Sequence, residues 1–222
     1  MKIVIQCASG KQAGAGYVQT EDGKRVMFVA QPQFAPPFRH EIVARPDDQS
    51  DRQVSWRMLL QEYNKSPGNN PWNLRPAFML YKNGIYRRLA DRFGVERVYI
   101  LSAGWGLIRA DFLTPQYDIT FSSRAEDYKR RARPAPTKND LFQDFQMLQD
   151  DADDSVMFFG GKDYLPLFCR LTENFRCRRK VFYNSATPPN ARGCDLQRYK
   201  GKPRTNWHYE CAKALLVSAV EA

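Results

Sequence analysis

Residues 97–121 read RVYILSAGWGLIRADFLTPQYDITF, and this stretch decides the fold class. Its first part, residues 98–102, is a run of β-branched and apolar side chains, which is typical of a buried strand. Gly104 and Gly106 follow and permit a sharp turn at the end of that strand. Pro115 then stiffens the return of the chain. The stretch therefore predicts a buried strand whose carboxyl end delivers aromatic and polar residues to one edge of a sheet.

Strand-like and helix-like segments alternate along the rest of the chain. Short apolar runs predict further strands at residues 2–7, 25–30, 156–159 and 179–183. Periodic apolar stripes predict helices over residues 54–63, 81–93, 140–148, 164–175 and 207–220. Gly94 is placed to end the second of these helices, and Pro166 fits the fourth only in its first turn.

This alternation predicts an α/β fold with a mainly parallel central sheet and helices on both faces. A chain of 222 residues with 43% hydrophobic side chains is long enough for one full core, so we expect a single domain over residues 1–222. A proline-rich loop at about residues 31–53 and a charged loop at about residues 122–139 are expected to interrupt it.

The net charge of +10 indicates affinity for a polyanion. Residues 170–213 hold eleven Lys and Arg against three Asp and Glu, and so carry eight of these ten charges. We expect a nucleic-acid partner, with DNA the first choice, and no membrane partner, because no apolar run approaches the roughly 20 residues of a spanning helix. Gln6 interrupts the apolar N-terminus too early for a signal peptide, which favours a cytoplasmic protein.

Two basic clusters in this region, RCRRK at residues 176–180 and RYKGKPR at residues 198–204, are candidates for phosphate contacts. The alternative is that both are solvated loops. The candidate phosphate-binding residues are Arg176, Arg178, Arg179, Lys180, Lys200, Lys202 and Arg204.

No metal site or cofactor is expected from the sequence. The five cysteines contain no C-x-x-C pair, and there are only two histidines. The glycine-rich run GKQAGAG at residues 10–16 has neither the dinucleotide spacing nor the Lys-Ser/Thr of a nucleotide-hydrolysing loop. It is a flexible loop after the first strand, or simply a turn.

Ligands in such folds bind beyond the carboxyl ends of the strands, so we expect the site at residues 7–16, 102–118 and 160–164. If the ligand is a nucleobase in DNA, an enzyme could cleave the N-glycosidic bond that joins the base to its sugar. Such cleavage needs a carboxylate that orients water or stabilises a cationic sugar, and either Asp118 or Asp111 is the candidate. The candidate base-binding residues are Ser102, Trp105, Tyr117, Gly160, Gly161, Tyr164, Cys7 and Lys11. Among them, Trp105 and Tyr117 are expected at the ligand edge, where they would stack on a base. In the alternative interpretation both are core aromatics and Asp118 caps a turn.

The segment ILSAGWGLIRADFLTPQYDITF resembles the I-S-A-K-x-G-L…P…Y-D signature of YaaA-like peroxide-stress proteins. Cys-Ala-Ser-Gly-Lys at residues 7–11 and Gly-Gly-Lys-Asp-Tyr at residues 160–164 are similar to two further motifs of that family, in the same order. The sequence departs from the pattern at Gly104 and Trp105, where a lysine and an aromatic residue or histidine are commoner. The resemblance implies DNA binding and a link to oxidative damage. A more distant similarity of the Leu…Pro…Tyr-Asp segment is to uracil-glycosylase-like domains of RNA-guanine transglycosylase relatives.

Two classes of function remain open from the sequence. The first is a DNA glycosylase-like enzyme that excises a modified or damaged base. The second is a DNA-binding module of the oxidative-damage response without catalysis. A third hypothesis makes Cys7 a nucleophile activated near Lys11, but no histidine base lies beside it in the sequence, so a buried inert thiol is preferred.

Overall fold

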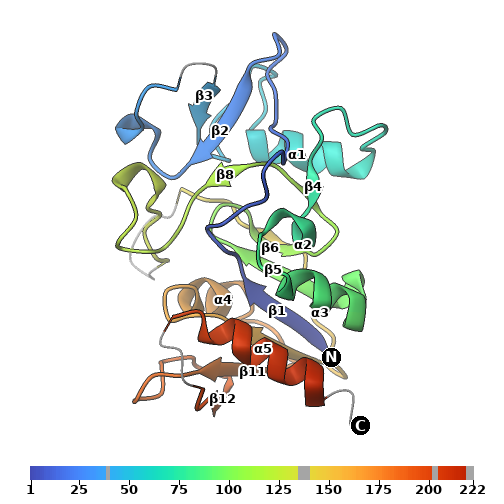
Figure 1. Cartoon of the computed structure of the whole chain (residues 1–222), viewed down its shortest axis with the longest axis vertical. Helices are drawn as coiled ribbons and strands as arrows, with labels where there is room; N and C mark the ends of the chain where they lie inside the picture. Colours follow the sequence, from blue (N-terminus) through green and yellow to red (C-terminus); the bar gives the residue numbers. More distant parts are fainter. Residues whose placement is uncertain (39–40, 135–140, 202–204, 219–222) are drawn as a thin grey trace.

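A sheet of seven strands forms the centre of the part of the chain that this computed structural model describes, residues 1–38, 41–134, 141–201 and 205–218 (Figure 1). Its strands, in spatial order, are β12 (Asp195–Arg198), β11 (Arg178–Tyr183), β10 (Ser155–Phe159), β1 (Lys2–Gln6), β5 (Val98–Ser102), β6 (Gly106–Arg109) and β9 (Phe145–Gln146). The first five run parallel, β6 returns antiparallel to β5, and β9 runs parallel to β6. The predicted α/β fold with a mainly parallel sheet is confirmed.

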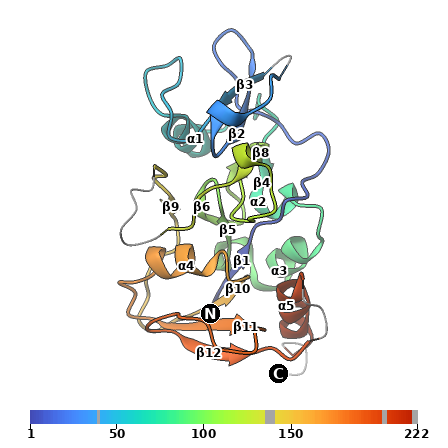
Figure 2. The ribbon, with the colours of Figure 1, turned by 90° about the vertical axis from the view of Figure 1, so that its left-hand side faces the viewer.

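Helices cover both faces of this sheet, as predicted. In Figure 2, α3 (Ile85–Phe93) and α5 (Trp207–Ser218) lie on one side and α4 (Leu165–Leu171) on the other. Helix α3 ends at Gly94 with φ 86°, and α4 carries Pro166 in its first turn, so both signals in the sequence are confirmed.

A second, smaller layer lies at the top of the molecule in Figure 1. Within the described residues it contains a parallel sheet of three strands in the order β3 (Glu41–Ala44), β2 (Arg25–Val29) and β8 (Tyr117–Asp118), with α1 (Trp56–Lys65) beside it. The two layers are joined by the antiparallel pair β4 (Arg75–Pro76) and β7 (Leu113–Thr114) and by α2 (Ala77–Leu80). Short 3-10 turns are η1 (Pro32–Phe34), η2 (Val95–Arg97) and η3 (Asp127–Lys129). Residues 97–121 thus belong to both layers, because they contain β5 and β6 of the large sheet and β8 of the small one.

Two segments differ from the sequence prediction. The helix expected over residues 140–148 is wrong where the structure describes it: Leu141 is exposed, and Phe145–Gln146 form β9. The N–H groups of Phe145 and Met147 donate to the carbonyls of Trp105 and Leu107, so pairing with the open edge of β6 overrides the local helical period. Strand β3 likewise lies inside the segment expected to be a proline-rich loop, because β2 offers it a parallel partner.

Candidate functional site

Hydrogen bonds within the turn between β5 and β6 stabilise its conformation. The Oγ of Ser102 accepts from the N–H groups of Gly104 and Trp105 at 3.2 and 3.1 Å. Gly106 follows with φ 86°, and a Cβ there would lie 2.6 Å from Asp144 Cβ and from the Phe145 backbone. Glycine at position 106 therefore permits the positive φ of this turn and leaves room for β9 beside β6.

Two buried arginines donate hydrogen bonds to the backbone carbonyls of this turn. The guanidinium of Arg57 donates to the carbonyls of Trp105 and Gly104 at 3.0 and 2.9 Å. That of Arg131 donates to the carbonyl of Ala103 at 2.8 Å. Three consecutive carbonyls at the end of the strand are thus satisfied by two cations from distant parts of the chain.

Each arginine is neutralised by a buried carboxylate. Arg57 pairs with Asp47 at 2.6 Å, with side chains 5% and 8% exposed. Arg131 pairs with Asp144 at 2.6 Å, with both side chains 1% exposed. Sequence reasoning did not single out any of the four, because no local pattern distinguishes a charged residue that pairs in the core from one that faces solvent.

The expectation that Trp105 is presented at the ligand edge is wrong. Its side chain is fully buried and its ring meets that of Phe28 edge to face, with centroids 5.0 Å apart. Tyr117 is 2% exposed, and its hydroxyl bonds to Ser102 Oγ at 2.9 Å and to Tyr81 at 2.8 Å. Both aromatics are core residues, held by these contacts inside the fold, so neither is available to stack on a base.

A cavity of about 550 Å³ opens where β1 and β10 end, at the carboxyl edge of the parallel strands. We call it the first cavity; residues that line it include Gln6, Cys7, Lys11, Asp118, Lys129 and Tyr164. The predicted junctions at residues 7–16 and 160–164 therefore do meet, and Asp118 from β8 joins them.

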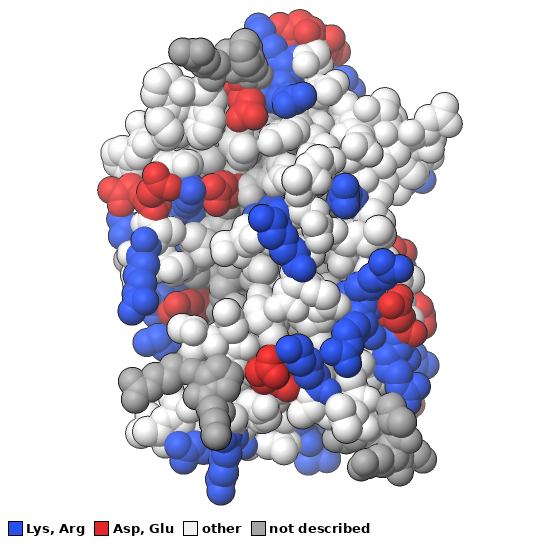
Figure 3. Space-filling model, in the orientation of Figure 1, with Lys and Arg blue, Asp and Glu red and all other residues white. Residues whose placement is uncertain are grey.

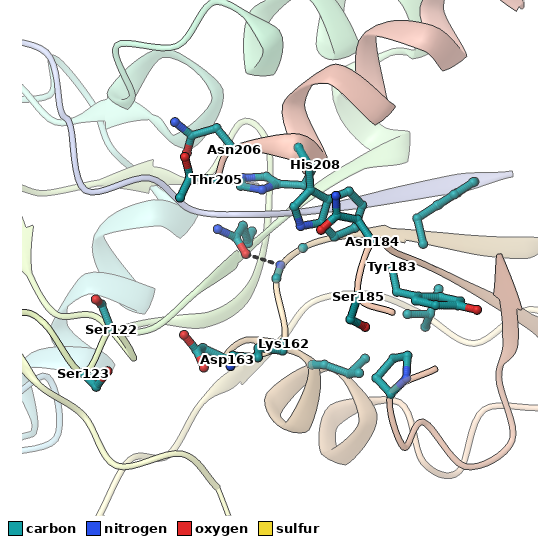
Figure 4. Close-up of a pocket in the computed structure, with 18 of the residues that line it drawn as sticks. Ser122, Ser123, Lys162, Asp163, Tyr183, Asn184, Ser185, Thr205, Asn206 and His208 are labelled. Carbon is teal, nitrogen blue, oxygen red and sulfur yellow. Dashed lines mark hydrogen bonds between the residues drawn. The ribbon is translucent and has the colours of Figure 1, made fainter. Parts of the chain in front are cut away.

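A second cavity of about 520 Å³ adjoins the first and continues past the ends of β10 and β11 (Figure 4). The two share Gln6, Ser122, Arg124, Gly161, Asp163 and Asn206, and we call them together the edge groove. Figure 4 shows Asp163 in the middle of the second cavity, with Ser122 on one side and Ser185 on another.

Asp118 is held in place by an ion pair at the rim of the first cavity. Its Oδ2 lies 2.8 Å from Lys129 Nζ, which also contacts Glu126 at 2.7 Å. These hydrogen bonds, first that to Asp118, raise the pKa of Lys129 above its ordinary value. The Asp118 side chain is 39% exposed, so water and a ligand reach the carboxylate.

Asp111, the other candidate carboxylate, does not reach the groove. It forms a two-pronged ion pair with Arg109, which is paired with Tyr99 near the amino end of β5. The prediction that Asp111 returns to the ligand edge is wrong, because the β5–β6 hairpin carries it to the opposite end of the strand.

Lys11 and Cys7 both line the first cavity. The ammonium of Lys11 lies 4.0 Å from the centroid of the Tyr117 ring, and burial lowers the pKa of Lys11. The thiol of Cys7 is 3.2 Å from the hydroxyl of Tyr164 and is 3% exposed. Burial raises the pKa of Tyr164 well above its ordinary value, so this hydroxyl stays protonated at neutral pH.

The two glycines after β10 have different roles. A Cβ on Gly160 would lie 2.2 Å from the Phe158 ring, so only glycine fits there. The N–H of Gly161 donates to Gln6 Oε1 at 2.6 Å, the dashed line in Figure 4. Gly161 is a candidate base-binding residue, but a base that accepted a hydrogen bond from this N–H would first have to displace Gln6.

His208, which the sequence left without a role, lines the second cavity and is 4% exposed. Burial lowers the pKa of His208 to about 4, so the ring is neutral at pH 7. Within the described residues, neither its Nε2 nor Asp163 Oδ1 has a hydrogen-bond partner, although Arg133 Nη2 lies 3.4 Å from the latter.

The first basic cluster lies away from the groove. Arg176 and Arg178 are exposed at the amino end of β11 and pair with Asp150 and Asp195. The groove is at the other end of this strand, about 16 Å away at 3.3 Å per residue. These two arginines therefore face solvent on the opposite edge of the sheet.

The other phosphate candidates differ in their burial. Arg179 is buried and donates to Thr172 Oγ1 and the Gly193 carbonyl, so its assignment to phosphate is wrong: its alternate position on β11 points it into the core. Lys180 is half-buried, whereas Lys200 is exposed. Lys200 lies on the groove side of the sheet, because the N–H of the preceding Tyr199 donates to the carbonyl of Tyr183, the last residue of β11. Lys202 and Arg204 lie outside the described residues.

Figure 3 shows basic side chains spread along one face with acidic ones among them.

No family model matches the chain, and a search of curated proteins found no match. The resemblance to the YaaA-like family thus stays a prediction. In the described part of the chain, no group of three or more His, Cys, Asp or Glu could hold a metal ion. No helix there is long and apolar enough to cross a membrane.

Proposed function

We propose that the protein binds DNA and acts on a nucleobase, hydrolysing the N-glycosidic bond of a modified or damaged base. The observation that carries this proposal is the partly exposed carboxylate of Asp118 in a cavity at the carboxyl edge of parallel strands. Ligands of open α/β sheets bind at this edge. A volume of about 550 Å³ is also within the range of small-ligand sites, roughly 300–1,000 Å³.

The chemistry needs a carboxylate that stays charged while a cationic sugar develops. Cleavage of a glycosidic bond passes through an oxocarbenium-like transition state, which a nearby carboxylate stabilises or to which it directs water. Asp118 has the charge, the fixed orientation from Lys129 and the access to solvent that this role requires. Asp118 is accordingly the catalytic residue of the proposal, and Asp111 is not part of it.

Recognition of the base would combine hydrogen bonds with contacts to aromatic residues other than Trp105 and Tyr117, which are buried. The groove offers polar groups such as Asn206 and Asp163, and aromatic side chains such as Tyr183 line its second cavity. Positive charge on the groove walls, from Arg124 and Lys162, would attract the phosphates that flank the base.

Binding without catalysis is the second candidate function. The ion pair between Asp118 and Lys129 joins β8 to η3, and this structural contact alone would account for an aspartate at position 118. Under this alternative the protein binds DNA in a salt-sensitive way, and no base is released.

A base-release assay separates the two. Duplex and single-stranded oligonucleotides with normal, uracil-type and oxidised bases are incubated with the protein, and free bases are detected by mass spectrometry. The proposal predicts release that disappears in Asp118→Asn, while DNA affinity is retained and the melting temperature changes little. Asp111→Asn, the same change on an exposed ion pair away from the groove, should leave release unchanged.

One result would count against the enzyme, and two others would count against the catalytic role of Asp118. Salt-sensitive binding with no release from any substrate supports the second candidate function. Full release by Asp118→Asn removes Asp118 as the catalyst, and unfolding of that variant shows that the aspartate is structural.

A further inference from the structure

We propose that Lys11 is a second reactive group of the first cavity, and that its amine forms an imine with the sugar carbon from which the base departs. This inference rests on the proposed function and names a covalent step for the same site. It assigns to Lys11 a chemical role distinct from the base contact that the sequence predicts.

The backbone fixes where the Lys11 side chain begins. On either side of it, the Gly10 carbonyl accepts from Lys82 N–H at 3.0 Å and Gln12 N–H donates to the Leu80 carbonyl at 2.8 Å. The loop after β1 is thus clamped to the segment that follows α2. From there the side chain extends over the face of Tyr117, at the cavity wall that Asp118 also lines.

The amine of Lys11 is uncommitted, which a nucleophile needs. Within the described ranges, its Nζ makes no hydrogen bond or ion pair, and its close contact is the Tyr117 ring at 4.0 Å. Lys129, in the same cavity, is bound by two carboxylates, Asp118 and Glu126. Of these two lysines, Lys11 is the one that can approach a carbon atom without first breaking an ion pair.

The surroundings of Lys11 also favour its neutral form. Burial lowers the pKa of Lys11; electrostatic interactions with Cys7 and Asp118 oppose this shift, and the interaction with Lys129 adds to it. Burial is the largest of these effects, so more of the amine is unprotonated at neutral pH than for an exposed lysine. Desolvation is a known way to activate a lysine for imine formation.

The step balances without an oxidant or reductant. The lone pair of neutral Nζ forms a bond to C1′, and the bond from C1′ to the base breaks. The base leaves with the electron pair and takes up one of the two protons of Nζ, carried by water. The bond from C1′ to the ring oxygen then opens, that oxygen takes the second proton of Nζ, and a neutral imine remains. Water adds to the imine and releases the free amine and an abasic aldehyde.

Trapping by borohydride tests the inference independently of base excision. The full chain is mixed with an oligonucleotide that already contains an abasic site, whose aldehyde needs no glycosylase, and sodium borohydride is added to reduce any imine to a stable amine. We expect a covalent protein–DNA complex at neutral pH, with Lys11 identified by mass spectrometry of the wild-type protein. Lys11→Arg, which keeps the charge but forms no imine, should lose the complex. Lys65→Arg on the exposed face of α1 should keep it.

The same samples distinguish a failure of this inference from a failure of the proposed function. Base release without a trapped complex, or a complex mapped to another lysine, overturns the role of Lys11 and leaves the glycosylase. A complex at Lys11 without base release from any substrate supports the reactive amine and overturns the glycosylase. Neither complex nor release overturns both. Mapping on the wild-type protein keeps the test valid if Lys11→Arg folds poorly.

Discussion

Replacement of Arg57 by methionine should destabilise the protein strongly, although Arg57 lies outside the edge groove. The change removes the cation that pairs with Asp47 and the two donors that satisfy the carbonyls of Gly104 and Trp105. Methionine fills similar space, so the effect reports lost polar contacts more than a cavity. A carboxylate 8% exposed would be left without its partner.

The magnitude follows from the burial of this pair. Removal of one partner of a buried ion pair costs about 3–5 kcal/mol, because the other charge stays in a poorly solvated place. In a chain of 222 residues each kcal/mol lowers the melting temperature by about 2–4 °C. We therefore expect Arg57→Met to melt about 6–20 °C below the wild type, by these two relations combined.

Thermal unfolding followed by circular dichroism, with urea titration beside it, measures this effect. The matched control is Arg87→Met on α3, whose pair with Asp91 is exposed and separated by 3.8 Å. Such a pair contributes at most about 1 kcal/mol. If the two variants melt at the same temperature, the buried arginine is not what holds the turn between β5 and β6.

Two further predictions concern charge. The pKa of His208 is lowered to about 4 from an ordinary 6.5. Between these two pH values the unfolded chain binds more protons than the folded one, so the stability present above pH 6.5 falls as the pH drops to 4. We expect the free energy of unfolding, measured by urea titration, to fall by about 3 kcal/mol from pH 7 to pH 4, and this loss to vanish in His208→Gln. If the variant shows the same dependence of unfolding free energy on pH as the wild type, the burial of the ring is contradicted. For DNA, the logarithm of affinity should fall linearly with the logarithm of salt concentration. Arg124→Gln with Lys162→Gln should reduce that slope by about 2, and Arg176→Gln with Arg178→Gln should leave it unchanged; the reverse would move the DNA to the opposite edge of the sheet.

The central strands were predictable because their apolar runs carry the signal of burial by themselves. Val98–Ser102 is buried at every position, and Ser155–Phe159 and Arg178–Tyr183 match the predicted runs closely. Gly94 at the end of α3 and Pro166 in the first turn of α4 were also predicted correctly, because each residue acts through its own backbone conformation and needs no distant partner. By contrast, Phe145–Gln146 form a strand only because β6 leaves an edge open, and no local pattern records that partner.

The site was predictable in place but not in detail. The rule that ligands bind at strand ends brought Cys7, Lys11, Asp118, Gly161 and Tyr164 to one cavity. It did not reveal which way an aromatic residue between two glycines would face, so Trp105 was expected outside. The orientation of Trp105 depends on Phe28 and on Arg57, which lie far away in the sequence.

The location of a bound base is the most direct test of this account. An oligonucleotide carrying one photoreactive 4-thiothymine is bound to the full chain and irradiated, and the crosslinked peptide is identified by mass spectrometry. We predict crosslinks to residues 118–129 or 160–164, which line the edge groove. Crosslinks confined to residues 176–180, at the opposite end of β11, would contradict the assignment of the groove to a nucleobase.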